Sequence, residues 1–153
     1  MGRDNRIYME VSALPENVGI VRMAVAALAA QAPFTVPDVE EIKVAVSEAV
    51  TNAIRHGYKA GPGRVRISAA LDDAVLEVLV EDEGVGMEDV AEARRAAASG
   101  EDPERLGLGF TFMESLMDGV EVESAPGRGT RVRMWKAIPR EGAQGPVRDG
   151  PRG

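Results

Sequence analysis

Glu48 and Asn52 are the first of three groups of residues whose types and spacing could form a ligand-binding site. They are four residues apart in a segment with helical periodicity. Residues at this spacing leave the same face of a helix one turn apart, so a carboxylate and an amide converge on one point. A Glu and an Asn at this spacing also occur on ordinary solvated helix faces, and the pair alone leaves both interpretations open.

The second group is an acidic residue with glycines behind it. Asp82 follows the apolar segment 75–80 and precedes Gly84 and Gly86. We expect an acceptor-only carboxylate at the mouth of a sheet, beside backbone that a planar ring can approach closely. Such a carboxylate could accept a hydrogen bond from an exocyclic amino group. The same pattern is typical of an ordinary turn that needs a positive φ, so both interpretations remain.

The third group is a glycine-flanked helix start with a cation beside it. Arg105 precedes Gly107 and Gly109, and a short helix is predicted to begin at Phe110. The free N–H groups and the positive dipole end of a helix start favour anionic phosphate. The alternative is a flexible surface loop that ends in a helix.

Two further segments extend the candidate site. Residues 87–105 are polar and contain Gly100 and Pro103, so this stretch could serve as a mobile lid. Thr130 follows Gly129 at the predicted start of the last strand and could add a hydroxyl, although this dipeptide is common at strand starts. Each signal is weak alone, and their order along the chain is what supports a nucleotide site.

The elements that must position these residues follow from the spacing of apolar side chains. Alternation over residues 7–13 predicts a strand, and helical spacing over residues 15–32 predicts a first helix. Thr35 as N-cap and Gly57 as C-terminal stop bound a second, longer helix with one continuous apolar stripe.

The second half of the chain predicts two hairpins around a short helix. Residues 65–71 alternate and residues 75–80 are almost continuously apolar, which predicts a surface strand paired with a more buried one. A short helix over residues 110–117 should precede a last hairpin of residues 120–123 with residues 131–135.

Strands at both ends and in the middle, with helices between them in blocks, predict an α+β fold. We expect a two-layer sandwich of one mixed, mostly antiparallel sheet under three helices. Residues 1–138 should form one domain, because a chain of this length buries about 70% of its unfolded surface. Residues 139–153 are rich in Pro, Gly and charge, and we expect a disordered tail there.

Composition limits the classes of function. The net charge of -7 would repel a phosphate backbone, so we expect no direct nucleic-acid binding. No apolar run approaches the ~20 residues of a membrane span, and the first residues lead into an alternating segment rather than the apolar core of a signal peptide. With zero cysteines as well, we expect a cytoplasmic protein without a membrane segment.

The order of the groups is similar to that of the four nucleotide-binding boxes of the gyrase and histidine-kinase (GHKL) superfamily, which shares the Bergerat ATP-binding fold. Residues 47–58, Ser-Glu-Ala-Val-Thr-Asn-Ala-Ile-Arg-His-Gly-Tyr, resemble one branch, the bacterial anti-sigma factors that are serine kinases, and most closely its sporulation members. Residues 107–111 and 113–114 support that branch. The similarity runs from about residue 7 to residue 138.

The resemblance implies Mg-ATP as the ligand, with ADP as the product. By position, Asn52 would give its side-chain oxygen to Mg²⁺, Asp82 would read the adenine amino group, and Glu48 would be the general base for an attacking serine hydroxyl. The other implied nucleotide contacts are Gly84 and Gly86 at the base, Thr130 near the adenine end, Gly107 and Gly109 at the phosphates, and Arg105 at the γ-phosphate.

The resemblance also implies the partners. The chain would be a homodimer that binds and inhibits a sporulation sigma factor of the sigma F type and phosphorylates a serine of its anti-anti-sigma antagonist. Arg22 matches an arginine that the family uses to hold both proteins. Leu106 stands where a small polar residue is expected before the glycine pair, which leaves the phosphate contacts of the lid open.

Three other functions remain as alternatives. A general-stress anti-sigma kinase has similar boxes, and a non-enzymatic module could use ATP as a structural ligand. The catalytic part of a two-component histidine kinase would need a phospho-accepting histidine on a dimerising hairpin, whereas His56, the sole histidine, stands at the end of the second predicted helix. His56 could be a second base or could cap that helix.

Overall fold

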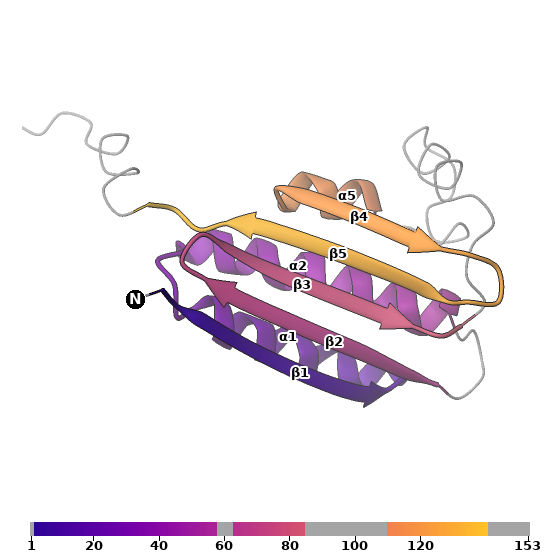
Figure 1. Ribbon diagram of the computed structural model, residues 1–153. Helices are drawn as coiled ribbons and strands as arrows, with labels where there is room; N and C mark the ends of the chain where they lie inside the picture. The colour runs from indigo at the N-terminus through magenta and orange to yellow at the C-terminus, as the bar shows by residue number, and fades with distance from the viewer. Residues whose placement is uncertain (1, 58–62, 85–109, 141–153) are drawn as a thin grey trace, which may run out of the picture.

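The computed structural model describes residues 2–57, 63–84 and 110–140. Five strands form one sheet in the order β1-β2-β3-β5-β4, and the helices cover one of its faces (Figure 1). The elements are β1 (Asp4–Ser12), η1 (Pro15–Asn17), α1 (Val18–Ala29), α2 (Val36–Asn52), η2 (Ala53–Gly57), β2 (Arg64–Asp72), β3 (Val75–Asp82), α5 (Phe110–Leu116), β4 (Gly119–Ser124) and β5 (Thr130–Ala137).

This architecture confirms the predicted α+β sandwich with a mostly antiparallel sheet. All four strand pairings within the described residues are antiparallel. The two predicted hairpins are β2 with β3 and β4 with β5, and the short helix is α5. The part of the predicted tail from residue 141 onward lies outside the described residues.

The core lies between the helices and the covered face of the sheet. Strand β2 was predicted to be a surface strand, and this prediction was wrong, because β2 lies between β1 and β3 and buries alternate residues much as β3 does. The buried residues of these two strands are Val65, Ile67, Ala69 and Leu71 on β2, and Leu76, Val78, Val80 and Asp82 on β3.

The ends of the first two helical segments differ in detail from the prediction. The first segment starts as the 3₁₀ turn η1 and its α-helix stops at Ala29, because the amides of Gln31 and Ala32 bond three residues back rather than four. The second begins where predicted: the Thr35 hydroxyl accepts from the Asp38 amide at 3.1 Å, and the Asp38 carboxylate accepts from the Thr35 amide at 2.9 Å.

After Asn52 the chain continues in the wider π-helical turn η2 as far as Gly57, the predicted stop. Helix α2, strand β3 and the turn between β4 and β5 all reach the same end of the molecule, on the right in Figure 1. At that end Asp82, the last residue of β3, pairs with Thr130, the first residue of β5. The fold therefore brings the predicted α2 and strand-end residues to one edge.

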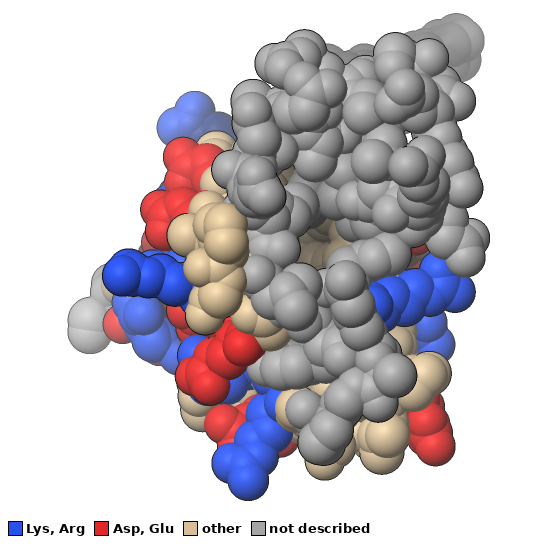
Figure 2. Space-filling model, turned by 90° about the vertical axis from the view of Figure 1, so that its right-hand side faces the viewer, with Lys and Arg blue, Asp and Glu red and all other residues tan. Residues whose placement is uncertain are grey.

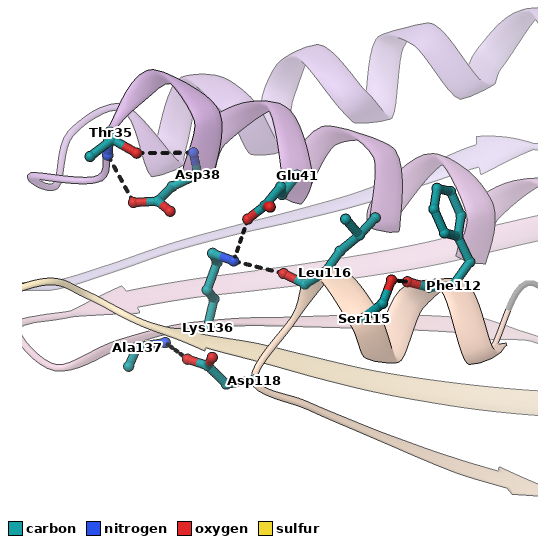
Figure 3. A network of polar contacts seen from close by, with 9 residues as sticks. All are labelled: Thr35, Asp38, Glu41, Phe112, Ser115, Leu116, Asp118, Lys136 and Ala137. Carbon is teal, nitrogen blue, oxygen red and sulfur yellow. Dashed lines mark hydrogen bonds and ion pairs between the residues drawn. The ribbon is translucent and has the colours of Figure 1, made fainter.

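Lys136 ties α5 to the rest of the fold (Figure 3). Its ammonium donates to the backbone carbonyl of Leu116 at 2.6 Å and pairs with Glu41 of α2 at 3.0 Å. The carboxylate of Asp118 accepts from the amide of Ala137 at 2.6 Å, which holds the following residues on β5 as well. The C-terminal end of α5 is thus fixed to both β5 and α2, and the cation lies where the helix dipole favours it.

We predict that Lys136→Met lowers the free energy of unfolding by about 1.5–3 kcal/mol, because the Leu116 carbonyl loses a charged donor while side-chain volume is kept. Chemical denaturation measures the change. Lys43→Met is the matched control: Lys43 pairs with Glu40 of α2 at 3.1 Å, the Glu40 side chain is 60% exposed, and such pairs contribute roughly 0–1 kcal/mol. Equal losses in the two variants would contradict the anchoring role of Lys136.

The β4–β5 turn places Thr130 through two glycines with positive φ. Gly127 has φ 76° and Gly129 has φ 80°. A Cβ on Gly129 would overlap the backbone carbonyl of Asp82, whereas a Cβ on Gly127 would meet nothing within 4 Å. Gly129 therefore serves both the turn and the close approach of β5 to the end of β3.

Alanine substitutions at the two glycines should separate these effects. Gly127→Ala should cost about 1–2 kcal/mol of stability, the usual penalty of a left-handed residue with a Cβ. Gly129→Ala should cost about 3 kcal/mol or more, since the strand end must also shift. Denaturant titration of both variants tests this, and a Gly129→Ala loss no larger than that of Gly127→Ala would refute the close approach.

Candidate functional site

Asp82 is a buried carboxylate on the helix-covered face of the sheet. It is 6% exposed, and its Oδ1 accepts from the amide of Gly84 at 2.8 Å. The backbone amide of Thr130 also bonds to it. The sequence-predicted neighbours Asp82, Gly84 and Thr130 are therefore brought together, with the carboxylate acting as an acceptor of backbone N–H groups.

Burial raises the pKa of the Asp82 carboxyl above its ordinary value of 3.8, against the lowering effect of the Gly84 and Thr130 amides and of Arg66. Because the folded-state pKa lies above the unfolded one, the ionised carboxylate lowers stability at pH values above the folded-state pKa. This cost fades as the pH falls through the folded-state pKa toward 3.8. An ionised side chain that lowers the stability of the fold, as the Asp82 carboxylate does, is typical of a functional position.

Asn52 carries a buried polar atom that lacks a partner within the described part of the chain. Its Nδ2 is inaccessible to solvent and has no hydrogen-bond partner among the described residues. A buried donor without an acceptor is costly, and such atoms commonly mark the place of a ligand or an ion. The amide could donate to a phosphate oxygen through Nδ2 while its Oδ1 faces a hard cation. Asn52 thus fits the predicted contact with Mg²⁺.

Glu48 lies one turn before Asn52 on α2 and is half-buried, as Asn52 is. Helix α2 contacts α5 on one side and β3 beneath, and η2 contacts β3 as well. The predicted pair therefore lies beside the core stripe rather than on the fully exposed side of the helix. A half-buried carboxylate in this position can still be reached by a protein or nucleotide ligand.

Arg22 lies on α1, at the contact with α2. Its guanidinium is half-buried and donates to the Ser47 hydroxyl over 3.5 Å, a long and weak hydrogen bond. Ser47 directly precedes Glu48, so α1 and the carboxylate-bearing turn of α2 are neighbours. Arg22 does not line the cleft that holds Asp82 and Thr130, and its partner-binding role stays a prediction.

A cleft of about 430 Å³ lies at the end of β3 and at the β4–β5 turn. Figure 2 looks onto this end of the molecule and shows basic and acidic side chains intermixed along one side of it. In this cleft Arg66 pairs with Glu83 at 2.8 Å and Arg131 with Glu81 at 3.5 Å. The lining residues are Arg66, Glu81, Asp82, Glu83, Glu123, Ser124, Ala125, Arg128, Gly129, Thr130 and Arg131.

Several predicted site residues lie outside the described residues, and their roles stay predictions. They include the lid over residues 87–105 and Leu106, and the nucleotide contacts Gly86, Arg105, Gly107 and Gly109. The structure describes the backbone of His56 and not its side chain, so its two possible roles also stay open.

The sequence analysis missed Ser124. Its hydroxyl lies 2.8 Å from the Thr130 hydroxyl and donates to the carbonyl of Gly129 at 2.9 Å. A signal was present, because Ser124 keeps the alternation of Val120 and Val122 and therefore faces the helices. The hairpin pairs it with Thr130.

Neither a side-chain cluster for a metal ion nor a membrane-spanning helix is present in the described residues. In the described ranges, no group of three or more His, Cys, Asp or Glu side chains could hold a metal ion. Within the same ranges, no helix is long and apolar enough to cross a membrane.

Comparison with known proteins places this geometry in a family. The model of the histidine kinase-like ATPase domain matches residues 11–136. The chain is 47% identical over 135 residues to the anti-sigma F factor of Geobacillus stearothermophilus, covering 87% of this chain and 92% of the relative. It is 43% identical over 136 residues to that of Bacillus subtilis, covering 88% and 93%. The Clostridium acetobutylicum anti-sigma F factor is 42% identical over 134 residues, covering 87% and 94%.

Solved structures share the fold at lower identity. The RsbU and RsbW domains of Rv1364c from Mycobacterium tuberculosis match with a TM-score of 0.62 and 20% identity, over 88% of this chain and 32% of that one. The histidine kinase domain of a blue-light activated kinase from Erythrobacter litoralis matches with a TM-score of 0.53 and 22% identity, over 85% and 62%. By the family model and the relatives together, the chain belongs to the histidine kinase-like ATPase family and, within it, to the anti-sigma F factors.

Proposed function

We propose that the chain is an anti-sigma factor that binds and inhibits a sporulation sigma factor of the sigma F type. With Mg-ATP it phosphorylates a serine of the anti-anti-sigma antagonist. The observation that carries this proposal is the buried amide nitrogen of Asn52, which has no hydrogen-bond partner in the described ranges. Asn52 lies one turn after Glu48 and at the same end of the fold as the buried carboxylate of Asp82.

Asp82 and its neighbours would hold the base. The Asp82 carboxylate accepts from the Gly84 amide and retains lone pairs for the exocyclic amino group of adenine. Gly84 bears no side chain and would leave room for the ring, together with Gly86 of the segment beyond. Thr130, paired with Asp82 across the sheet, would contact the same end of the nucleotide.

Asn52 would hold the phosphate end. Its Oδ1 would bind Mg²⁺ and its Nδ2 would donate to a phosphate oxygen. The phosphate would thus satisfy Nδ2, which has no partner among the residues that the structure describes. When bound, Mg²⁺ neutralises negative charge on the phosphates during transfer. Arg105, Gly107 and Gly109 are proposed to contact the phosphates from the other side.

Glu48 would act as general base. The serine oxygen of the antagonist attacks the γ-phosphorus, the bond from that phosphorus to the bridging oxygen of ADP breaks, and the serine proton passes to the Glu48 carboxylate. The position of Glu48 supports this role, because it is half-buried one turn from the phosphate-binding Asn52.

The outer side of α1 supports a protein partner. Ile20 is 58% exposed and Met23 is 63% exposed, and they flank Arg22 in the sequence. Because they are three residues apart, Ile20 and Met23 leave α1 on the same face, and exposed apolar side chains on one face suit a protein surface better than free solvent. We propose that Arg22 and these neighbours contact the sigma factor and the antagonist in turn, with ADP or ATP deciding between them, and that the chain is a homodimer in the cytoplasm. We also propose that residues 1–138 form the functional domain and that residues 139–153 are a disordered tail.

Two alternatives keep the fold and change the activity. A general-stress anti-sigma kinase would use the same site with another sigma factor, and co-purification from the native cell would identify the protein held. A non-enzymatic ATP-binding module would bind nucleotide and transfer nothing. The presence of Glu48 beside Asn52 favours the kinase over this module.

The kinase is tested by Glu48→Gln with labelled ATP and a purified anti-anti-sigma protein. The variant should lose ~10²- to 10⁴-fold in the rate of phosphoserine formation, because the serine proton has no acceptor, while its Kd for Mg-ADP stays within about twofold. Glu40→Gln is the matched control: Glu40 is an exposed α2 glutamate, and the variant should keep the wild-type rate.

Two results would count against this assignment. If the wild-type chain binds nucleotide and yields no phosphoserine, the chain is a binding module. If Glu48→Gln loses nucleotide affinity together with activity, Glu48 supports the pocket and is not the base.

A further inference from the structure

Three polar side chains form one row across the helix-covered face of the sheet. Ser124 of β4 pairs with Thr130 of β5, and Thr130 pairs with Asp82 of β3. Side chains directly opposite in antiparallel strands have their Cβ atoms about 4.5–5.5 Å apart. All three residues line the same cleft. The hydroxyl of Thr130 therefore lies between the Ser124 hydroxyl and the Asp82 carboxylate.

The direction of the hydrogen bonds in this row follows from a count of protons. A serine hydroxyl has one proton, and a backbone carbonyl can act as an acceptor and never as a donor. The Ser124 hydroxyl donates to the carbonyl of Gly129 at 2.9 Å, which uses its single proton. The 2.8 Å contact between the Ser124 and Thr130 hydroxyls must then be formed by the proton of Thr130.

This direction determines what Thr130 can offer a ligand. With its proton donated to Ser124, the Thr130 Oγ1 has lone pairs left and no proton. The neighbouring Asp82 carboxylate is also an acceptor. On the helix-covered face, both groups thus require a ligand that donates hydrogen bonds.

From this geometry we propose that Ser124 is a specificity-determining residue, which holds the Thr130 hydroxyl as an acceptor and so selects adenine over guanine. The inference rests on the proposed function, because it takes the helix-covered side of the Asp82–Thr130 pair as the base site. Adenine carries an amino donor at position 6, whereas guanine carries a carbonyl acceptor there. A guanine carbonyl that faces two acceptors in a buried site is left without a donor, which is costly.

A purely structural role for Ser124 predicts a different result. Loss of a hairpin contact would lower stability and weaken all nucleotides to the same degree. A role in fixing the proton direction changes the ratio of affinities, because Thr130 without its acceptor can rotate and donate to a guanine carbonyl. The ratio of the Kd for Mg-GDP to the Kd for Mg-ADP is therefore the informative readout.

The test measures both Kd values by titration calorimetry for the full chain and three variants. The wild type should favour ADP by tenfold or more, and Ser124→Ala should reduce that preference by about tenfold, mainly through tighter GDP binding. Ser124→Thr keeps the hydroxyl and should restore the wild-type ratio. Thr130→Val has neither a hydroxyl proton nor a lone pair, and it should weaken ADP binding without strengthening GDP binding. Thermal unfolding of each variant checks that it is folded.

The outcomes distinguish the inference from the function on which it rests. A preference unchanged within twofold in a folded Ser124→Ala, or equal ADP and GDP affinities in the wild type, overturns the inference and leaves nucleotide binding intact. If Ser124→Ala does not fold, the inference is still tested by the ratio of the two Kd values in the wild type and by Thr130→Val. A gain of GDP affinity in Thr130→Val overturns the inference. If the wild type binds neither nucleotide, the proposed function fails and the inference fails with it.

Discussion

The antiparallel register between β3 and β5 is the constraint on which the site depends. It sets Asp82 opposite Thr130 and turns both toward the helices. Side chains alternate between the two faces of a sheet, so a slip of one residue would send the carboxylate to the open face and bring Glu81 or Glu83 inside. The close approach of Gly129 to the Asp82 backbone opposes such a slip, since any residue with a Cβ at this position would push the strands apart.

Helix α2 brings the second part of the site to this end of the sheet, and α5 packs against α2. The capping box at Thr35 fixes where α2 begins, and seventeen residues of α-helix then carry Asn52 to the end of the sheet where Asp82 lies. Lys136 fixes the C-terminal end of α5 against α2 and β5, so the helix that follows the predicted lid is anchored at its far end. The amide of Asn52 and the carboxylate of Asp82 are both buried at a cost to stability, which is reasonable where a ligand rather than the fold satisfies them.

Much of this arrangement could be predicted from the sequence because local patterns decide it. The alternation of apolar residues predicted the strands, and the Thr35 cap predicted the start of α2. The i, i+4 spacing predicted that Glu48 and Asn52 lie on one side of that helix. The features that were not predicted depend on contacts between distant segments: the second strand is an inner strand of the sheet because β1, from the start of the chain, pairs with it. Ser124 and Lys136 matter through partners in other strands and helices, and residue type alone does not reveal such partners.

The central claim is that an adenine nucleotide binds between the end of α2 and the end of β3. Amide ¹H–¹⁵N spectra recorded during titration with Mg-ADP test it most directly. The account predicts saturable shifts of the Asn52 side-chain amide and of the Gly84 and Thr130 backbone amides, with the β1 amides of Arg6 and Tyr8 unchanged. Shifts confined to the open face of the sheet, or the absence of any shift at millimolar nucleotide, would contradict it.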